Sequence, residues 1–156
     1  MTTTDYALLI EQARAITAGE PDLIANLSNL SALVYETLTD VNWVGFYLTR
    51  EANTLVLGPF QGKVACLRIP FGRGVCGTAA STRETQRVID VHEFAGHIAC
   101  DSASNSEVVV PIIVNDTVVG VFDLDSPSVG RFSEADAQGL TQLGRFIETL
   151  NWQASW

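Results

Sequence analysis

The stretch EVVVPIIVNDTVVGVFDLD, residues 107–125, decides the fold, because it contains two β-branched runs joined by Asn115-Asp116. Valine and isoleucine pack well on a pleated sheet, and Asn and Asp tolerate the left-handed backbone of a tight turn. We therefore expect Glu107–Val114 and Thr117–Asp125 to form the central antiparallel hairpin.

The sequence on either side of this hairpin predicts an α+β fold. Apolar residues at helical spacing predict a helix at Thr4–Ala18 and a second one that follows Pro21, a residue favoured at helix starts. Ser133, with Asp136 three residues later, predicts the start of a final helix. Further strands, and a glycine turn with a short helix, are expected at Asn42–Leu48, Thr54–Leu57, Lys63–Ile69, Gly72–Ser81 and Arg87–Ile89. We expect a central antiparallel six-stranded sheet, flanked by N- and C-terminal helices and covered on one face.

Composition indicates a single acidic domain over residues 1–156. The chain has 18 acidic and 9 basic residues, a formal charge of −9, with 47% hydrophobic and 17% charged residues. Without a Lys/Arg cluster we expect no nucleic-acid partner, and without an apolar run of about 20 residues we expect no membrane span. The N-terminus lacks the features of a signal peptide, so we expect a cytoplasmic protein. The low charged fraction suggests a covered surface, and hence a homodimer.

The three cysteines differ in their surroundings. Cys66, in a predicted strand, and Cys76, in the glycine turn, each fit a small buried side chain. Cys100 lies in a polar segment without apolar periodicity, where a thiol is accessible, although the source of its activation stays open. The spacing of Cys100 from His92 and His97 matches no tetrahedral zinc pattern, so we expect no metal.

Asp123 and Asp125 project from one face of their strand, together with Val119 and Val121. The face is either wet near the strand end or a covered pocket, in which two like charges raise the pKa of one carboxyl and make it a proton donor. Glu107 is harder to place. A regular two-residue turn puts it opposite Leu124 on the apolar face, unless a bulge near Pro111 intervenes or Glu107 precedes the regular pairing.

Two further features allow two interpretations each. Trp43 and Tyr47 share a strand face and form either the wall of a small-molecule pocket or part of the core. The string GRGVCG at residues 72–77 matches a dinucleotide-binding pattern. That pattern requires a parallel βαβ unit, whereas short turns join most strands here, so we expect a tight turn without a nucleotide.

Six blocks carry a family resemblance: NWVGFYL (42–48), LGPFQGKVAC (57–66), IPFGRGVCGT (69–78), GHIACD (96–101), SNSE (104–107) and GVFDLD (120–125). In this order they resemble the free methionine-(R)-sulfoxide reductases, a catalytic branch of the GAF-domain fold. The resemblance spans nearly the whole chain and includes all three cysteines.

The resemblance implies a reaction and a set of site residues. It assigns Cys100 as the nucleophile, Cys66 as the resolving cysteine and Cys76 as an auxiliary cysteine. It assigns substrate binding to Glu107, Asp123 and Asp125, with Trp43 and Tyr47 in an aromatic wall. The implied reaction is reduction of free methionine-(R)-sulfoxide through a sulfenic acid and an intramolecular disulfide, with thioredoxin as reductant and no bound cofactor.

Two other classes of protein remain as alternatives. A non-catalytic GAF sensor would bind a small ligand or nucleotide and signal to a partner, for which 156 residues leave little room for an output domain. A scaffold that only dimerises would leave the cysteines without a role.

Overall fold

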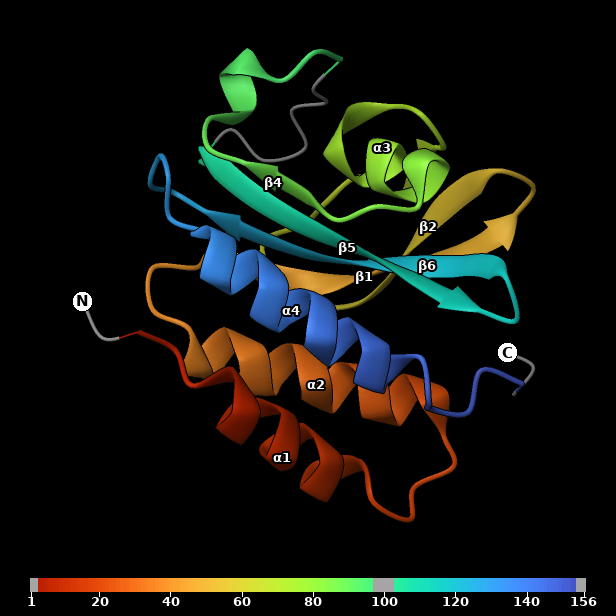
Figure 1. Cartoon of the computed structure of the whole chain (residues 1–156). Coiled ribbons are helices and arrows are strands. Elements are labelled where there is room, and N and C mark those ends of the chain that lie inside the picture. Colours follow the sequence, from red (N-terminus) through yellow and green to blue (C-terminus); the bar gives the residue numbers. More distant parts are fainter. Residues whose placement is uncertain (1–2, 97–102, 154–156) are drawn as a thin grey trace.

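Helices lie on both faces of one antiparallel sheet in the computed structural model, which describes residues 3–96 and 103–153 (Figure 1). The α-helices are α1 (Tyr6–Thr17), α2 (Leu23–Thr37), α3 (Gly74–Thr82) and α4 (Glu134–Ile147). The strands are β1 (Trp43–Glu51), β2 (Thr54–Gly62), β3 (Arg68–Pro70), β4 (Gln86–Val88), β5 (Ser106–Val114) and β6 (Thr117–Ser126). A short 3₁₀ helix, η1, spans Val91–Glu93.

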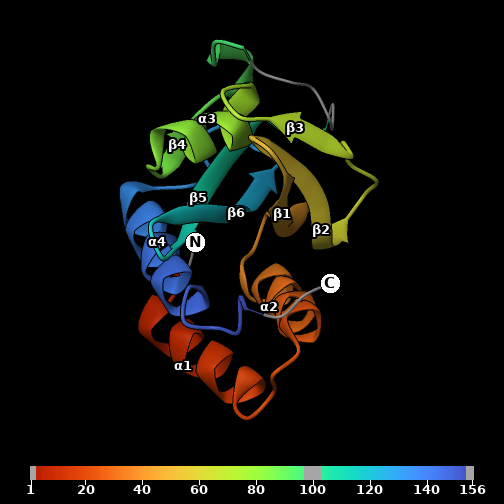
Figure 2. The ribbon, with the colours of Figure 1, turned by 90° about the vertical axis from the view of Figure 1, so that its right-hand side faces the viewer.

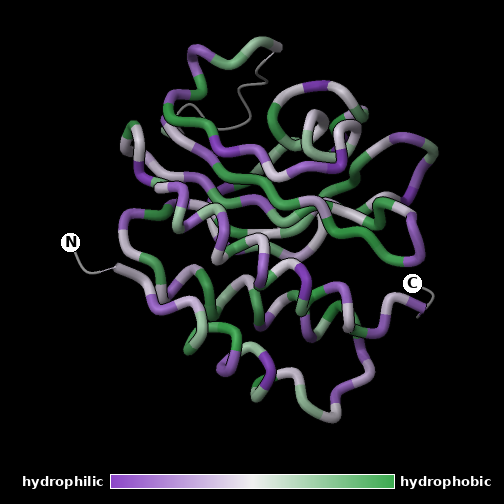
Figure 3. Tube along the Cα trace, viewed as in Figure 1, coloured by the Kyte–Doolittle hydropathy of each residue, from purple (hydrophilic) through white to green (hydrophobic). Residues whose placement is uncertain are grey.

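Within the described residues the sheet has six strands in the order β3-β2-β1-β6-β5-β4, and all neighbouring pairs are antiparallel. The first and the last strand of the chain, β1 and β6, thus pair at the centre of the sheet. Hydrophobic residues concentrate along these strands (Figure 3). The expected α+β architecture with a six-stranded antiparallel sheet is confirmed.

The helices α2 and α4 cover one face, here called the helix face, and α1 packs against these two helices as an outer layer (Figure 2). Its core contains strand residues of every second position, among them Phe46, Val110, Phe122 and Leu124, all fully buried. The predicted cap of α4 is confirmed, because Ser133 Oγ accepts a bond from the Asp136 backbone N–H at 3.0 Å.

The N-terminal helices begin at aspartates. Asp5 caps α1 and Asp22 caps α2, each accepting a backbone N–H through its carboxylate. The expectation that the second helix follows Pro21 is confirmed, because Pro21 directly precedes the cap residue Asp22. No helix within residues 3–96 and 103–153 is long and apolar enough to cross a membrane.

The opposite face, here called the pocket face, is covered by α3 and by the segments on either side of it (Figure 2). The expectation that helices cover only one face is therefore wrong. The apolar and polar residues of α3 do not separate onto two sides of the helix, so the sequence did not indicate which surface it covers. It packs through small residues, including Ala79 and Ala80, against Val109 and Val121 of the sheet.

The segment expected as a strand at Lys63–Ile69 is largely a loop. The strand β2 continues to Gly62, which pairs with Trp43, and β3 contains only three residues. The chain must return from Gly62 to pair Arg68 with Val56 in the first half of β2, so residues 63–67 cross over instead of joining the sheet. Cys66 consequently lies in a loop and is half-buried.

Candidate active site

The register of the β5–β6 hairpin brings Glu107 into line with the aspartates. Asn115 and Asp116 form the turn with positive φ angles of 51° and 63°, as expected for a tight hairpin. The register then shifts by one residue between Ile112 and Ile113, so that Glu107 pairs with Asp125. A bulge therefore does re-aim Glu107, which answers the question that the sequence left open.

The bulge is near Pro111, as expected, with its extra residue in β6 opposite Ile112 and Ile113. Ile112 pairs with Gly120 while Ile113 pairs with Val118, which leaves Val119 as the extra residue. Val118 packs on the pocket face and Val119 against the helix face. The expectation that Val119 shares a face with the aspartates is wrong for this reason, while Val121 does share it.

The acids and the aromatic residues meet because their strands are adjacent. Trp43 pairs with Asp125, which pairs in turn with Glu107, so the three form one row across β1, β6 and β5. Asp123 lies in the next row opposite Gly45, which has no side chain to occupy the space. A Cβ atom at Gly45 would collide with Phe60 on the neighbouring strand.

A cavity opens over these rows, between the sheet, α3 and the loop that contains Cys66. Its lining includes five of the expected site residues on the sheet and one cysteine: Trp43, Tyr47, Cys76, Glu107, Asp123 and Asp125. The two aspartates therefore border a covered pocket and not a wet strand end. Asp123 is 4% exposed and Glu107 is 8% exposed.

Cys76 belongs to the first turn of α3 and points at the acids. Its Sγ lies 3.9 Å from Glu107 Oε2, and the side-chain ligand atoms of Cys76, Glu107 and Asp123 all lie within 4.8 Å of one another. A helix N-terminus favours thiolate. Here burial, and then the charges of Asp123 and Glu107, raise the pKa of the Cys76 thiol well above its usual value. Cys76 is therefore a protonated thiol at neutral pH.

The buried acids hold protons for the same reason. Burial raises the pKa of Asp123 to about 8, with a further contribution from Asp125. Burial and the neighbouring Asp123 raise the pKa of Glu107 well above the usual range. The pocket thus contains carboxyl groups that can donate a proton near neutral pH or ionise beside a cation.

The aromatic wall is a stack that also contacts the loop of Cys66. Trp43 lies between Tyr47 and Phe60, with ring centroids 5.8 Å and 5.1 Å away. The Trp43 indole N–H donates to the carbonyl of Lys63 at 3.1 Å. Burial raises the pKa of Tyr47, so its hydroxyl stays neutral. The wall therefore presents an apolar surface to the cavity and also contacts the start of the loop over residues 63–67.

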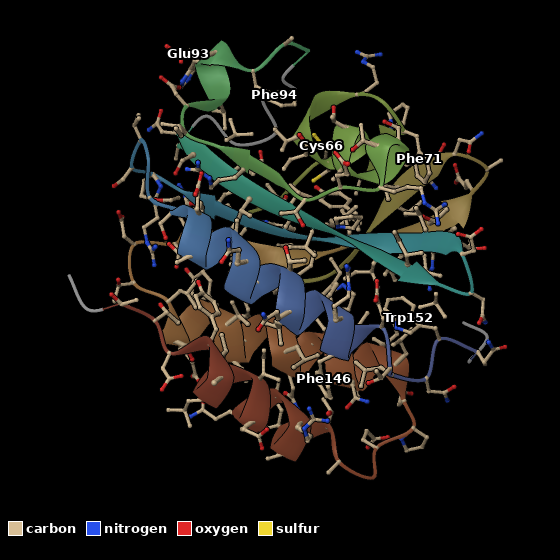
Figure 4. All side chains as sticks on the ribbon, in the orientation of Figure 1. Cys66, Phe71, Glu93, Phe94, Phe146 and Trp152 are labelled. Atoms are coloured by element: carbon tan, nitrogen blue, oxygen red, sulfur yellow. The ribbon has the colours of Figure 1, made fainter. Side chains whose placement is uncertain are left out.

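The two described cysteines are in different redox states. Cys66 is disulfide-bonded, and Cys76 is a free, buried thiol. Figure 4 shows Cys66 on the α3 side of the sheet, whereas Phe146 and Trp152 lie by the helix face. Cys100 and His97 lie outside the described residues. His92, on η1, is exposed and contacts Asp90 at 2.9 Å.

Some residues of the cavity escaped the sequence analysis. Arg73, directly before α3, and the buried Ser104 also line it. A basic residue inside a glycine turn was the available signal for Arg73. For Ser104 the signal was its place in a polar segment that closes on Glu107.

The cavity does not have the design of a dinucleotide site. The glycine string leads into α3, but β3 and its neighbour are antiparallel and no parallel pair occurs among the strands in the described ranges. In the same part of the chain, the group that could hold a metal ion is Cys76 with Glu107 and Asp123.

The chain with this covered six-stranded antiparallel sheet and a pocket under a short helix matches a known family. The GAF domain matches residues 22–150 of the chain. The chain belongs to the GAF-domain family. This GAF domain is 59% identical over 148 residues to the free methionine-R-sulfoxide reductase of Escherichia coli, covering 95% of this chain and 89% of that one. It is 50% identical to the enzyme of the same name from Saccharomyces cerevisiae, over 89% of this chain and 81% of that one.

Comparison with a solved structure supports the same relationship at the level of the fold. This GAF domain superimposes with a TM-score of 0.88 on the free methionine-R-sulfoxide reductase from Neisseria meningitidis, solved in complex with its substrate. The two share 44% identity over 95% of this chain and 91% of the other. Within its family, this GAF domain groups with the free methionine-R-sulfoxide reductases.

Proposed function

We propose that this GAF domain reduces free methionine-(R)-sulfoxide to methionine, with Cys100 as the nucleophile. The observation that carries the proposal is the meeting of Glu107, Asp123 and Asp125 with an aromatic wall in one covered pocket, beside a disulfide-bonded Cys66. The names of its close relatives support the same substrate.

The buried carboxyl groups account for the first half of the reaction. The sulfur of a sulfoxide becomes electrophilic when its oxygen is protonated, and a carboxyl whose pKa is near 8 still holds a proton at neutral pH. The Cys100 thiolate reacts with the protonated sulfoxide, and the hydroxyl passes from the substrate sulfur to Cys100 Sγ, so that the substrate S–O bond breaks while a Cys100 S–O bond forms. Methionine leaves, and Cys100 is oxidised to a sulfenic acid.

A second thiol completes the cycle. The Cys66 thiol attacks the sulfenic sulfur, water leaves, and a Cys66–Cys100 disulfide forms. That Cys66 is disulfide-bonded while Cys76 is a free thiol supports Cys66 as the resolving residue. Thioredoxin, a low-potential dithiol, then reopens the disulfide by exchange in the cytoplasm.

The same carboxylates give a reason for selectivity toward the free amino acid. The ammonium group of free methionine sulfoxide can pair with Asp123, Asp125 or Glu107, whereas the corresponding nitrogen in a peptide is an uncharged amide. We expect the methionine-sulfoxide tripeptide to be turned over far more slowly than the free amino acid. Equal turnover of the two would contradict this role of the acids.

Substitution of Cys100 by Ser tests the proposal. The variant should stay folded by circular dichroism and lose turnover of free methionine sulfoxide, while Asp116→Asn, on the exposed hairpin turn, should retain turnover as the control. Mass spectrometry of the wild type after one turnover should find a Cys66–Cys100 disulfide. A sensor would instead show no turnover in the wild type, and Cys100→Ser would leave its ligand affinity unchanged.

We also propose that two copies of the chain form a homodimer. Four large apolar side chains of α1 and α2 are exposed: Leu8, Ile16, Ile24 and Tyr35. A partner copy over these helices would remove that surface from water. Sedimentation velocity should give a dimer for the wild type and a monomer for Leu8→Lys, whereas a monomeric wild type would contradict the proposal.

A further inference from the structure

The cluster of Cys76, Glu107 and Asp123 combines two carboxyl groups of the proposed substrate pocket with a buried thiol that takes part in no step of the proposed reaction. The three side chains come from α3, β5 and β6, and each is more than nine-tenths buried, at 5%, 8% and 4% exposure. They offer one sulfur and two carboxylates to the same point of the cavity. The cluster therefore buries one thiol and two carboxyl groups together with no basic side chain among them, which is unusual inside a protein.

One atom of this cluster has no partner. Asp123 Oδ1 is buried, lines the cavity with its residue, and makes no hydrogen bond within the described part of the chain. A buried polar atom without a hydrogen bond is costly. Its lone pairs are therefore available to a ligand that enters the cavity, and a cation would satisfy them best.

The spacing of the three ligand atoms fits a small ion. Zinc bonds of about 2.3 Å to sulfur and 2.1 Å to oxygen, at a tetrahedral angle, place the two ligand atoms roughly 3.6 Å apart. Cys76 Sγ and Glu107 Oε2 are 3.9 Å apart, and the third ligand atom lies within 4.8 Å of both. Small side-chain rotations therefore complete three sides of a tetrahedron, and the cavity leaves the fourth position for water.

The electrostatic balance also favours a divalent cation. Asp125 lines the same cavity and adds a third carboxylate, and Tyr47 is neutral there. Arg73 is the positive group of the cavity lining and opposes a cation, but its side chain is at the exposed end before α3. A thiolate among the ligands selects soft ions such as zinc over magnesium or calcium.

We propose that Cys76, Glu107 and Asp123 form a binding site for one thiophilic divalent cation, of which Zn²⁺ is the type. Binding displaces protons from the ligands and involves no change of oxidation state. The ion would occupy the space over the acids and exclude other ligands from the cavity. The site shares Glu107 and Asp123 with the proposed substrate pocket, so the ion would compete with substrate, but its geometry does not involve Cys100.

Cobalt titration of a protein with a single thiol tests the site. In the full-length Cys66→Ser, Cys100→Ser protein, Cys76 is the only cysteine, so a thiolate-to-cobalt charge-transfer band reports on that residue alone. We expect one Co²⁺ per chain and displacement of the band by one equivalent of Zn²⁺. Adding Cys76→Ser should abolish the band.

A second variant distinguishes an ion bound by all three side chains from an ion bound by the Cys76 thiol alone. Because loss of even an outer-shell partner weakens metal binding about 10–100-fold, Asp123→Asn should weaken Co²⁺ affinity at least that much. Asp116→Asn, on the exposed hairpin turn, should leave it unchanged. Absence of the band in the folded single-thiol protein, or an affinity that Asp123→Asn does not alter, would overturn the proposal. Neither readout depends on turnover, so a failure here leaves the reductase proposal intact.

Discussion

The two faces of β6 differ completely although their residues alternate along one strand. Phe122 and Leu124 point to the helix face and are buried among apolar side chains only. Asp123 and Asp125 point to the pocket face and border the cavity. The comparison teaches that a shift of one position along the strand separates residues that hold the fold together from residues that border the cavity.

Burial of side chains has opposite effects on stability at the two faces. Burial of an aromatic or aliphatic side chain on the helix face stabilises the fold by about 1.5–3 kcal/mol. Burial of Asp123 and Glu107 on the pocket face opposes their ionisation and raises the pKa of both. The pocket face thus retains groups that lower stability at neutral pH, which is typical of a site kept for its chemistry.

The largest effect should follow from removing a helix-face residue. Phe122 stacks on Phe46 with ring centroids 4.7 Å apart, and both are fully buried. Phe122→Ala should lower the free energy of unfolding by about 3–5 kcal/mol, measured by urea denaturation. The kcat/KM of the folded variant should change little. A large loss of kcat/KM with unchanged stability would break the comparison.

Removing a pocket-face acid should have the reverse result, a large loss of kcat/KM with little loss of stability. Asp123→Asn keeps the shape of the side chain but removes its charge and its acidic proton. We expect kcat/KM for free methionine-(R)-sulfoxide to fall about 100-fold, since breaking a buried charge pair costs about 2–5 kcal/mol. Steady-state kinetics with Asp116→Asn as the matched surface control would measure it. An unchanged kcat/KM would remove Asp123 from the site.

The fold was largely predictable because local signals agree with the global arrangement. The paired β-branched runs, the Asn115-Asp116 turn and the Ser133 cap each act within a few residues, and the structure has all three. The short helix α3 was expected in place, but its role as a cover for the second face was not. Its small residues pack without an amphipathic pattern, so no periodicity indicated which surface it covers.

The site was less predictable because it depends on a register that one residue sets. Regular pairing from the turn would put Glu107 opposite Leu124, and only the extra residue Val119 moves it opposite Asp125. A bulge has no strong sequence signature, so the sequence left this choice open. A strand was predicted around Cys66 because the side chains on either side of it alternate in character. The segment is a loop because the chain must return along β2 to pair Arg68 with Val56.

The pH dependence of stability should sharpen the comparison further. The pKa of Asp123 is about 8 in the folded chain against 3.8 as a reference. Between these values the folded state holds a proton that the unfolded chain has released, so unfolding releases a proton and stability falls as the pH rises. One such group contributes a slope of about 1.4 kcal/mol per pH unit, and Glu107 adds a slope of the same sign.

Urea denaturation from about pH 5 to pH 8 measures this slope. Asp123→Asn should flatten it, because the substitution removes one of the two groups that hold a proton in the folded state. Leu124→Ala, on the helix face of the same strand, should lower stability at every pH and leave the slope as it is. Equal slopes in the wild type and in Asp123→Asn would contradict the assignment of a buried proton to this residue.

The smallest effect should come from a contact that links the pocket wall to the loop of Cys66. Trp43→Phe retains an aromatic ring between Tyr47 and Phe60 but deletes the hydrogen bond to the carbonyl of Lys63. Loss of one such bond should cost about 1 kcal/mol of stability. Because Lys63 begins the loop that carries Cys66, we also expect faster reduction of the Cys66 disulfide by a small dithiol. Tyr47→Phe, which keeps the ring and the loop contact, is the matched control. If the Cys66 disulfide of both variants is reduced at the wild-type rate, the aromatic wall and the loop are independent. The pocket face then divides into a binding part and a redox part, and this hydrogen bond does not connect them.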